Sequence, residues 1–267
     1  MRLVDSHCHL ELAEFDDDRE EVLQRAKATC VSAILAINTS KKVDELEGSI
    51  RLAETYEEVW ATVGVQPHDA HKADDDVYPR MLELARHPKV VAVGETGLEY
   101  RYDFAPRPAQ QVAFVRQLRI AGAVRKPIVI HTREAWDDTF AILEEHWRPY
   151  ALPGIMHCFT GGPREAERCL EMGFYLSFSG ILTYKNTDEI CEAARLAPAD
   201  RILIETDAPL LAPAPVRGKR NEPANVLYTA LKLAEVRGEP LVRVAQAVAE
   251  NFDRVCLRGS DASGYTG

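Results

Sequence analysis

Short apolar runs rich in β-branched residues recur along the chain, and each is followed by a longer stretch with helical spacing. We expect eight strands, at Leu3–Ser6, Val31–Ile37, Val59–Val65, Val90–Gly94, Pro127–Ile130, Gly154–His157, Phe174–Phe178 and Arg201–Ile204. Glycines and prolines fall mainly between these units, and each interval is long enough for one helix and two loops. This spacing is typical of βα units joined by right-handed crossovers.

The stretches between the strands are rich in Ala, Leu, Glu and Arg at helical spacing. Predicted helices include Asp18–Thr29, Val43–Tyr56 and Gln110–Arg125, and two more, Ala224–Arg237 and Leu241–Leu257, follow the last strand. Eight βα units predict a closed parallel (β/α)8 TIM barrel, and we expect a single domain over residues 1–267. An open doubly wound sheet is the alternative fold. Its nucleotide-binding form is weakened because no GxGxxG or GxxxxGK[ST] motif follows a strand.

Composition is that of an ordinary globular protein, with 46% hydrophobic and 28% charged residues among 267. No apolar run reaches the roughly 18 residues of a membrane span, so we expect no membrane partner. The first five residues lead straight into polar sequence, and we expect no signal peptide. The six cysteines are scattered without a CxxC pair, which favours reduced thiols and a cytoplasmic location.

The charge balance is acidic, with 42 Asp+Glu against 32 Lys+Arg and a formal net charge of −10. A surface of that sign argues against coating nucleic acid through a broadly basic face. It leaves open a small local site whose positive charge comes from metal ions.

Ligand-type side chains cluster where the predicted strands end, which is where a barrel enzyme carries its reactive groups. They are His7 and His9 on the first strand, Glu95 on the fourth, His131 on the fifth, His157 on the sixth and Asp207 on the eighth. Strand alternation places both histidines of the first strand on one face and Cys8 on the other. Four imidazoles and two or three carboxylates converging there can hold two divalent ions, with a bridging carboxylate such as Glu95 between them.

Each of these residues also has a purely structural interpretation. An HxH pair or a single histidine can be a satisfied polar group, and Asp207 ahead of Ala-Pro can start a turn. Their conjunction favours a metal site, because burying the whole set without metal would leave unpaired polar groups at about 1–3 kcal/mol each. Asp5 and Glu205 lie deeper on the same strand faces, and we expect them to orient ligand histidines. His68, after the third strand, either contacts substrate or serves loop structure.

Six motifs occur in order along the chain: Asp5-Ser-His-Cys-His9-Leu, Val93-Gly-Glu-Thr-Gly-Leu98, His131-Thr-Arg133, His157-Cys-Phe-Thr-Gly161, Leu176-Ser-Phe-Ser-Gly180 and Ile204-Glu-Thr-Asp-Ala-Pro209. Together they resemble the TatD-type metal-dependent deoxyribonucleases, and the match runs from about residue 3 to residue 256. The resemblance implies a TIM barrel of the amidohydrolase-like superfamily that hydrolyses DNA phosphodiesters with two metals. One departure is Gln66, where family members often have His, which weakens a substrate role for that loop.

The resemblance also assigns roles. Its implied ligands are His7, His9, Glu95 and Asp207 for one metal, and Glu95, His131 and His157 for the other. Asp207 is the expected general base. The expected ions are Mg²⁺ or Mn²⁺, with Zn²⁺ competing for the imidazoles.

The expected substrate is DNA, single-stranded or at duplex ends, degraded by exonuclease action in DNA repair or degradation. We expect Arg217 and Lys219, together with Arg220, to meet its phosphates, and we expect a monomer.

Two alternative functions remain. The first is a C–N bond hydrolase of the same superfamily. Such binuclear enzymes commonly bridge their metals with a carboxylated lysine at the end of strand four, where this chain has Glu95. The second is a non-catalytic metal-binding protein, which metal-dependent release of nucleotides from DNA would exclude.

Overall fold

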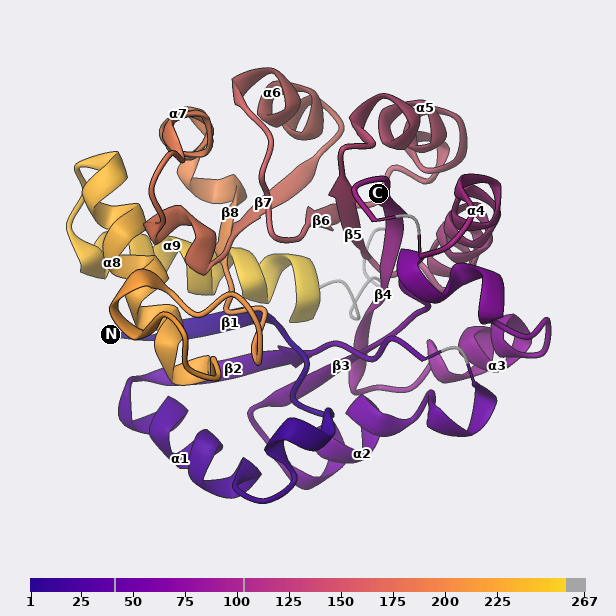
Figure 1. Cartoon of the computed structure of the whole chain (residues 1–267), viewed down its shortest axis with the longest axis horizontal. Helices are drawn as coiled ribbons and strands as arrows, with labels where there is room; N and C mark the ends of the chain where they lie inside the picture. The colour runs from indigo at the N-terminus through magenta and orange to yellow at the C-terminus, as the bar shows by residue number, and fades with distance from the viewer. Residues whose placement is uncertain (41, 103, 258–267) are drawn as a thin grey trace, which may run out of the picture. The chain divides into compact units, whose positions relative to one another are not determined.

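The computed structural model describes residues 1–40, 42–102 and 104–257. Its strands are β1 (Leu3–Cys8), β2 (Val31–Ala36), β3 (Val59–Val63), β4 (Val90–Glu99), β5 (Ile128–Arg133), β6 (Gly154–Met156), β7 (Phe174–Phe178) and β8 (Ile202–Ile204). They form one sheet in sequence order, β1 to β8, and helices alternate with strands along the chain (Figure 1). The predicted (β/α)8 TIM barrel is confirmed.

The α-helices of the described residues are α1 (Arg19–Ala28), α2 (Gly48–Thr55), α3 (Val77–Leu84), α4 (Arg107–Val124), α5 (Trp136–His146), α6 (Pro163–Glu171), α7 (Asp188–Leu196), α8 (Val226–Arg237) and α9 (Leu241–Phe252). The predicted helix Val43–Tyr56 is divided into a 3₁₀ turn, Val43–Glu45, and α2. The last predicted helix ends as α9 and continues as a π-helical turn, Asp253–Leu257. Across the described ranges, no helix is long and apolar enough to cross a membrane.

The chain divides into two compact units. The first unit comprises residues 1–36, 56–59 and 156–252, and it contains β1, β2, β7 and β8. The second unit comprises residues 37–55, 60–155 and the segment from Asp253, and it contains β4 and β5. The single-domain organisation stays a prediction.

In the first unit, β1 is buried along its whole length, as are β7 and β8. Near-continuous apolar sequence is what a parallel strand covered on both faces requires. The buried side chain of Asn251, on α9, donates to the carbonyls of Ala199 and Ile202, each at 2.8 Å. These bonds fix α9 to the beginning of β8.

In the second unit, β4 is longer than the sequence predicted: it continues past Gly94 to Glu99, and all ten residues are buried. Gly94 and Gly97 have φ of +132° and +133°. A Cβ on Gly97 would lie 2.0 Å from the carbonyl oxygen of His131, and one on Gly94 would lie 2.5 Å from that of Val129. The two glycines therefore allow β4 to lie close against β5, where any side chain would clash.

Gln117, fully buried on α4, holds this part of the sheet in place. Its side-chain oxygen accepts from the Val65 backbone N–H at 2.8 Å, and its amide nitrogen donates to the Val65 carbonyl and to Thr96 Oγ1. One side chain thus joins α4, β4 and the segment that follows β3. A buried amide with these bonds satisfied fixes a single packing of the helix on the sheet.

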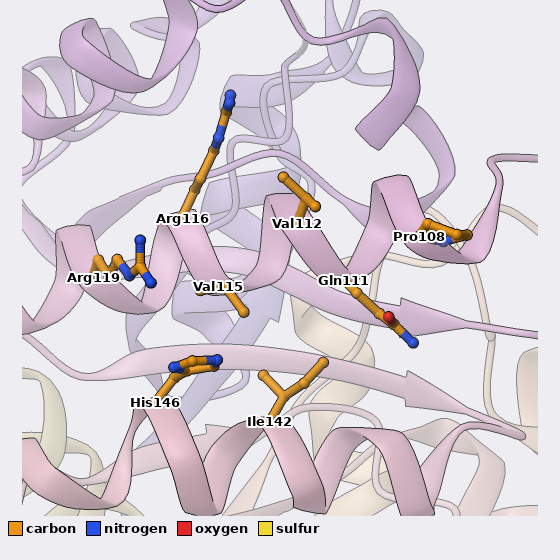
Figure 2. A pocket seen from close by; sticks show the side chains of 8 residues that line it. All are labelled: Pro108, Gln111, Val112, Val115, Arg116, Arg119, Ile142 and His146. Carbon is orange, nitrogen blue, oxygen red and sulfur yellow. The ribbon is translucent and has the colours of Figure 1, made fainter.

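A groove of about 480 Å³ lies on the surface of the second unit between α4 and α5. Figure 2 shows Val115 of α4 and Ile142 of α5 facing the space between the helices, with Arg119 and His146 toward one end. Its lining contains none of the ligand-type residues singled out from the sequence.

Candidate metal centre

Asp5 fixes the backbone at the base of the candidate site in the first unit. Its carboxylate is buried and accepts from the Thr206 N–H at 2.9 Å, from the Thr206 hydroxyl, and from the His7 N–H at 3.3 Å. Burial raises the pKa of Asp5 to about 8. These bonds hold the backbone of His7 and the segment after β8, and the role of Asp5 in orienting a ligand histidine stays a prediction.

Asp207 lies between the two histidines of β1. Its Oδ1 is 3.6 Å from Nε2 of His7 and 3.4 Å from Nε2 of His9. Burial acts to raise the pKa of Asp207, but the neighbouring histidines, His9 foremost, hold it below its usual value. Burial likewise acts to lower the pKa of His9, and Asp207 together with Glu11 raises it well above the usual range. The Asp207 carboxylate is therefore ionised at neutral pH.

His157 and Glu205 complete the group in the first unit. The ring of His157 stacks on that of His7, with centroids 3.7 Å apart and planes at 18°. Glu205 Oε1 lies 3.0 Å from His157 Nδ1 and accepts from the Cys158 N–H at 2.8 Å. A hydrogen bond from Nδ1–H to this carboxylate leaves Nε2 of the ring as the atom available to a metal.

The donor set of the first unit fits a divalent cation. His7, His157 and Glu205 each offer a ligand atom, and these atoms lie within 4.8 Å of one another. Within the described residues, Glu205 Oε2 is buried and has no hydrogen-bond partner. A buried carboxylate oxygen left this way is costly, and the positive charge of a cation held by the neighbouring imidazoles would offset that cost.

The second unit brings Glu95 and His131 together. Glu95 Oε1 is 3.1 Å from His131 Nδ1, and Glu99 Oε2 is 3.2 Å from His131 Nε2. His68 Nε2 is 3.7 Å from Glu99 Oε2. Burial acts to raise the pKa of Glu99, but the hydrogen bond with His131 and two backbone N–H groups bring it below its usual value. Burial lowers the pKa of His68, and His131 lowers it further.

Two carboxylates in these groups were not singled out from the sequence. Glu99 is four residues after Glu95, so it shares that residue's face as long as the strand continues. Glu11 follows His9 by two residues, and its Oε1 is 3.7 Å from His9 Nδ1. The spacing along β4 could have identified Glu99, whereas Glu11 lies in the turn after β1 and only its nearness to His9 in the sequence pointed to it.

The basic segment after β8, residues 217–220, contains one cation held by an ion pair and two cations that are exposed. Arg220 pairs with Asp18 at 2.6 Å, donates to the Glu14 carbonyl and packs over the Phe15 ring, so we no longer expect it to meet phosphate. Arg217 is exposed and packs over Tyr184 at 4.1 Å, and Lys219 is also exposed.

Asn221 anchors the same segment. Its side chain is fully buried and donates to the carbonyls of Thr206 at 2.9 Å and Leu210 at 2.7 Å. The segment that carries Arg217 and Lys219 is thereby fixed to the residues around Asp207.

A family model described as TatD related DNase matches residues 4–256 of this chain. The chain belongs to this family. The curated relatives include the uncharacterized metal-dependent hydrolase YabD of Bacillus subtilis, 40% identical over 95% of this chain and 98% of its own length. The 3'-5' ssDNA/RNA exonuclease TatD of Cronobacter turicensis is 36% identical over 97% of this chain and 99% of its own length.

A solved structure of the TatD homologue YjjV from Escherichia coli has a TM-score of 0.89 and 30% identity, covering 96% of this chain and 98% of that one. The protein is thus a metal-dependent hydrolase of the TatD family. All six ligand-type residues fall within the matched range.

Proposed function

We propose that this TatD-family protein is a deoxyribonuclease that removes nucleotides from the 3' end of single-stranded DNA. The observation that carries the proposal is the donor set of the two units. His7, His9, His157 and Asp207 lie together in one, and Glu95 and His131 lie together in the other. All six lie in the C-terminal half of a strand or shortly after it, which is where a (β/α)8 barrel enzyme carries its reactive groups.

We assign two divalent ions to these donors, Mg²⁺ or Mn²⁺, with Zn²⁺ as a competitor for the imidazoles. His7, His9, Glu95 and Asp207 would hold one ion, and Glu95, His131 and His157 the other. Two such ions supply water activation, neutralisation of the phosphate charge and stabilisation of the leaving alkoxide.

The protein's own groups orient the ligands and move the proton. Asp207, whose pKa is held low beside His9, is ionised and accepts a proton from the attacking water. Glu205 holds Nδ1 of His157, and Glu99 contacts His131 on the ring nitrogen opposite Glu95. These contacts fix the ring orientations before substrate binds.

The substrate class rests on three lines of support. The Cronobacter turicensis relative is named as a 3'-5' exonuclease of single-stranded DNA and RNA. Arg217 and Lys219 supply local positive charge on a chain of net charge −10. Glu95 stands where C–N bond hydrolases of the wider superfamily commonly carry a carboxylated lysine. We further propose a cytoplasmic location, since no disulfide joins the six cysteines, all of which are described. We also propose that the chain acts as a monomer.

The test is hydrolysis of single-stranded oligonucleotides by the purified protein, with one set labelled at the 5' end and another at the 3' end. With Mg²⁺ or Mn²⁺, the 5'-labelled set should shorten step by step and the 3'-labelled set should release labelled mononucleotide at once. A matched RNA oligonucleotide and a duplex serve as competitors. Absence of nucleotide release under every metal condition overturns the proposal in favour of a C–N bond hydrolase or a non-catalytic metal-binding protein.

A further inference from the structure

Two aromatic rings are exposed in the segment that follows β4. Tyr102 has 44% of its surface exposed and Phe104 has 61%. Their ring centroids are 5.4 Å apart and their planes differ by 27°, so the rings stack on each other. Large apolar rings exposed side by side leave aromatic surface accessible to solvent.

Both ends of this segment are fixed by buried hydrogen bonds. Glu99 Oε1 accepts from the N–H groups of Arg101 at 2.6 Å and Tyr102 at 3.2 Å. Gln110, buried on α4, donates from Nε2 to the carbonyls of Glu99 at 3.0 Å and Ala105 at 2.9 Å. The described residues on either side of the ring pair are thus held in place, which lowers the entropy lost when a ligand binds.

The same segment is connected to a predicted metal ligand. The carboxylate of Glu99 that binds the Tyr102 N–H also lies 3.2 Å from His131 Nε2. The ring of Phe104 meets the edge of His68 at 5.2 Å, and His68 is 6.0 Å from His131 between ring centroids. The Arg133 guanidinium, two residues beyond His131 on β5, packs over the Tyr102 ring at 5.1 Å. Aromatic faces and a cation therefore alternate beside the reactive end of β5.

This combination matches what single-stranded nucleic acid requires. Bases of a single strand are unpaired, and they stack on aromatic side chains with little dependence on sequence. A chain of net charge −10 repels a polyanion over most of its surface, and stacking supplies affinity that does not depend on that charge. A cation beside the rings suits the phosphate of the stacked nucleotide.

We propose that Tyr102 and Phe104 form a stacking platform for a nucleobase next to the cleaved phosphodiester, with Arg133 meeting the adjoining phosphate. This inference rests on the proposed nuclease function and adds the element that selects unpaired bases. Stacking contacts the face of a base and makes no hydrogen bond to its edge. We therefore expect the protein to prefer single-stranded over duplex DNA and to show no preference for base sequence.

The first experiment compares two substrates, an intact single-stranded oligonucleotide and the same strand with abasic residues at its last three 3' positions. The readout is the ratio of kcat/KM for the intact strand to that for the abasic strand. We expect a ratio of about ten for the wild type, since that factor lies within the range that stacking on one base supplies. Phe104→Leu and Tyr102→Leu should bring the ratio toward one, and Phe104→Trp should restore it.

The matched control is Val242→Ala, which alters a side chain 59% exposed at the beginning of α9. Its ratio should equal that of the wild type. A wild-type ratio near one, or a ratio that Phe104→Leu and Tyr102→Leu leave unchanged, overturns the platform.

The second experiment separates failure of the platform from failure of the nuclease proposal. An oligonucleotide with 2-aminopurine near its 3' end is titrated with the full-length protein in the presence of chelator, so that no hydrolysis is needed. Stacking should quench the 2-aminopurine emission, and the Phe104→Leu variant should bind about tenfold more weakly with less quenching. Equal binding and quenching by wild type and variant overturns the platform even if hydrolysis is observed. Quenching without hydrolysis under any metal condition overturns the nuclease and leaves a nucleic-acid-binding face.

Discussion

Replacing Glu205 by Gln tests the orientation of His157 more sharply than any other single change. The Glu205 side chain is fully buried, and its Oε1 accepts from His157 Nδ1 at 3.0 Å and from the Cys158 N–H at 2.8 Å. Gln keeps the shape and an acceptor oxygen but removes the charge. A hydrogen bond to a charged group is worth ~1 kcal/mol more than a neutral one.

Two such bonds give a loss of ~2 kcal/mol, which corresponds to an increase of about 30-fold in the metal dissociation constant. Mutation of a residue that hydrogen-bonds to a metal ligand typically weakens metal affinity by about 10- to 100-fold, and the expected value lies inside that range. At saturating metal, the fall in kcat should be smaller than for a variant that removes a ligand, because the six donors remain.

The assay is titration of the chelated protein with Mn²⁺ against a chromogenic chelator, followed by rate measurement at saturating metal. Glu250→Gln, which alters a surface carboxylate on α9, is the matched control and should bind as the wild type does. A wild-type dissociation constant for Glu205→Gln would refute the reasoning. Complete loss of metal, equal to that caused by removing Asp207, would instead make Glu205 a direct ligand.

Three further predictions follow from named contacts. Asp207→Asn should lower kcat by at least about 10²-fold while oligonucleotide binding persists, because the substitution removes the proton acceptor. Hydrolysis rates and the fluorescence anisotropy of a bound oligonucleotide check this, and an unchanged rate contradicts it. Replacing Arg217 and Lys219 together by Ala should flatten the dependence of log affinity on log salt by about 1.4 units, since each phosphate contact contributes about 0.7 on single strands; an unchanged slope removes both residues from the phosphate path. Burial lowers the pKa of Lys126 from 10.5 to about 8, so the unfolded chain binds more protons between these values, and the stability of the wild type relative to Lys126→Met should increase as pH rises through this window. Urea unfolding of both proteins at pH 7.5 and pH 10 measures the change, and a relative wild-type stability that stays constant or falls contradicts the prediction.

The fold could be predicted because most of the strands are short apolar runs and each interval between them is long enough for one helix and two loops. The end of β4 could not. Gly94 and Gly97 read as a turn signal in the sequence, whereas in the fold they allow close approach to β5. That requirement depends on the neighbouring strand, so the sequence alone ended the strand too early and passed over Glu99.

The candidate ligands could be identified because parity along a strand determines which side chains share a face. Their supporting contacts depend on pairings between distant segments. Asp5 binds Thr206, 201 residues away, and Arg220 binds Asp18, 202 residues away. Nothing in the local sequence distinguishes a basic residue held this way from one such as Lys219 that remains exposed.

We propose that this chain hydrolyses DNA phosphodiesters with divalent ions held by the six donors. The metal content of the purified protein and its rate on end-labelled single-stranded DNA should be measured together, before and after thorough chelation and again after Mg²⁺ or Mn²⁺ is restored. We expect loss of activity on chelation, recovery on restoration and a stoichiometry of two ions per chain. Full activity with the metal content confirmed near zero would contradict it.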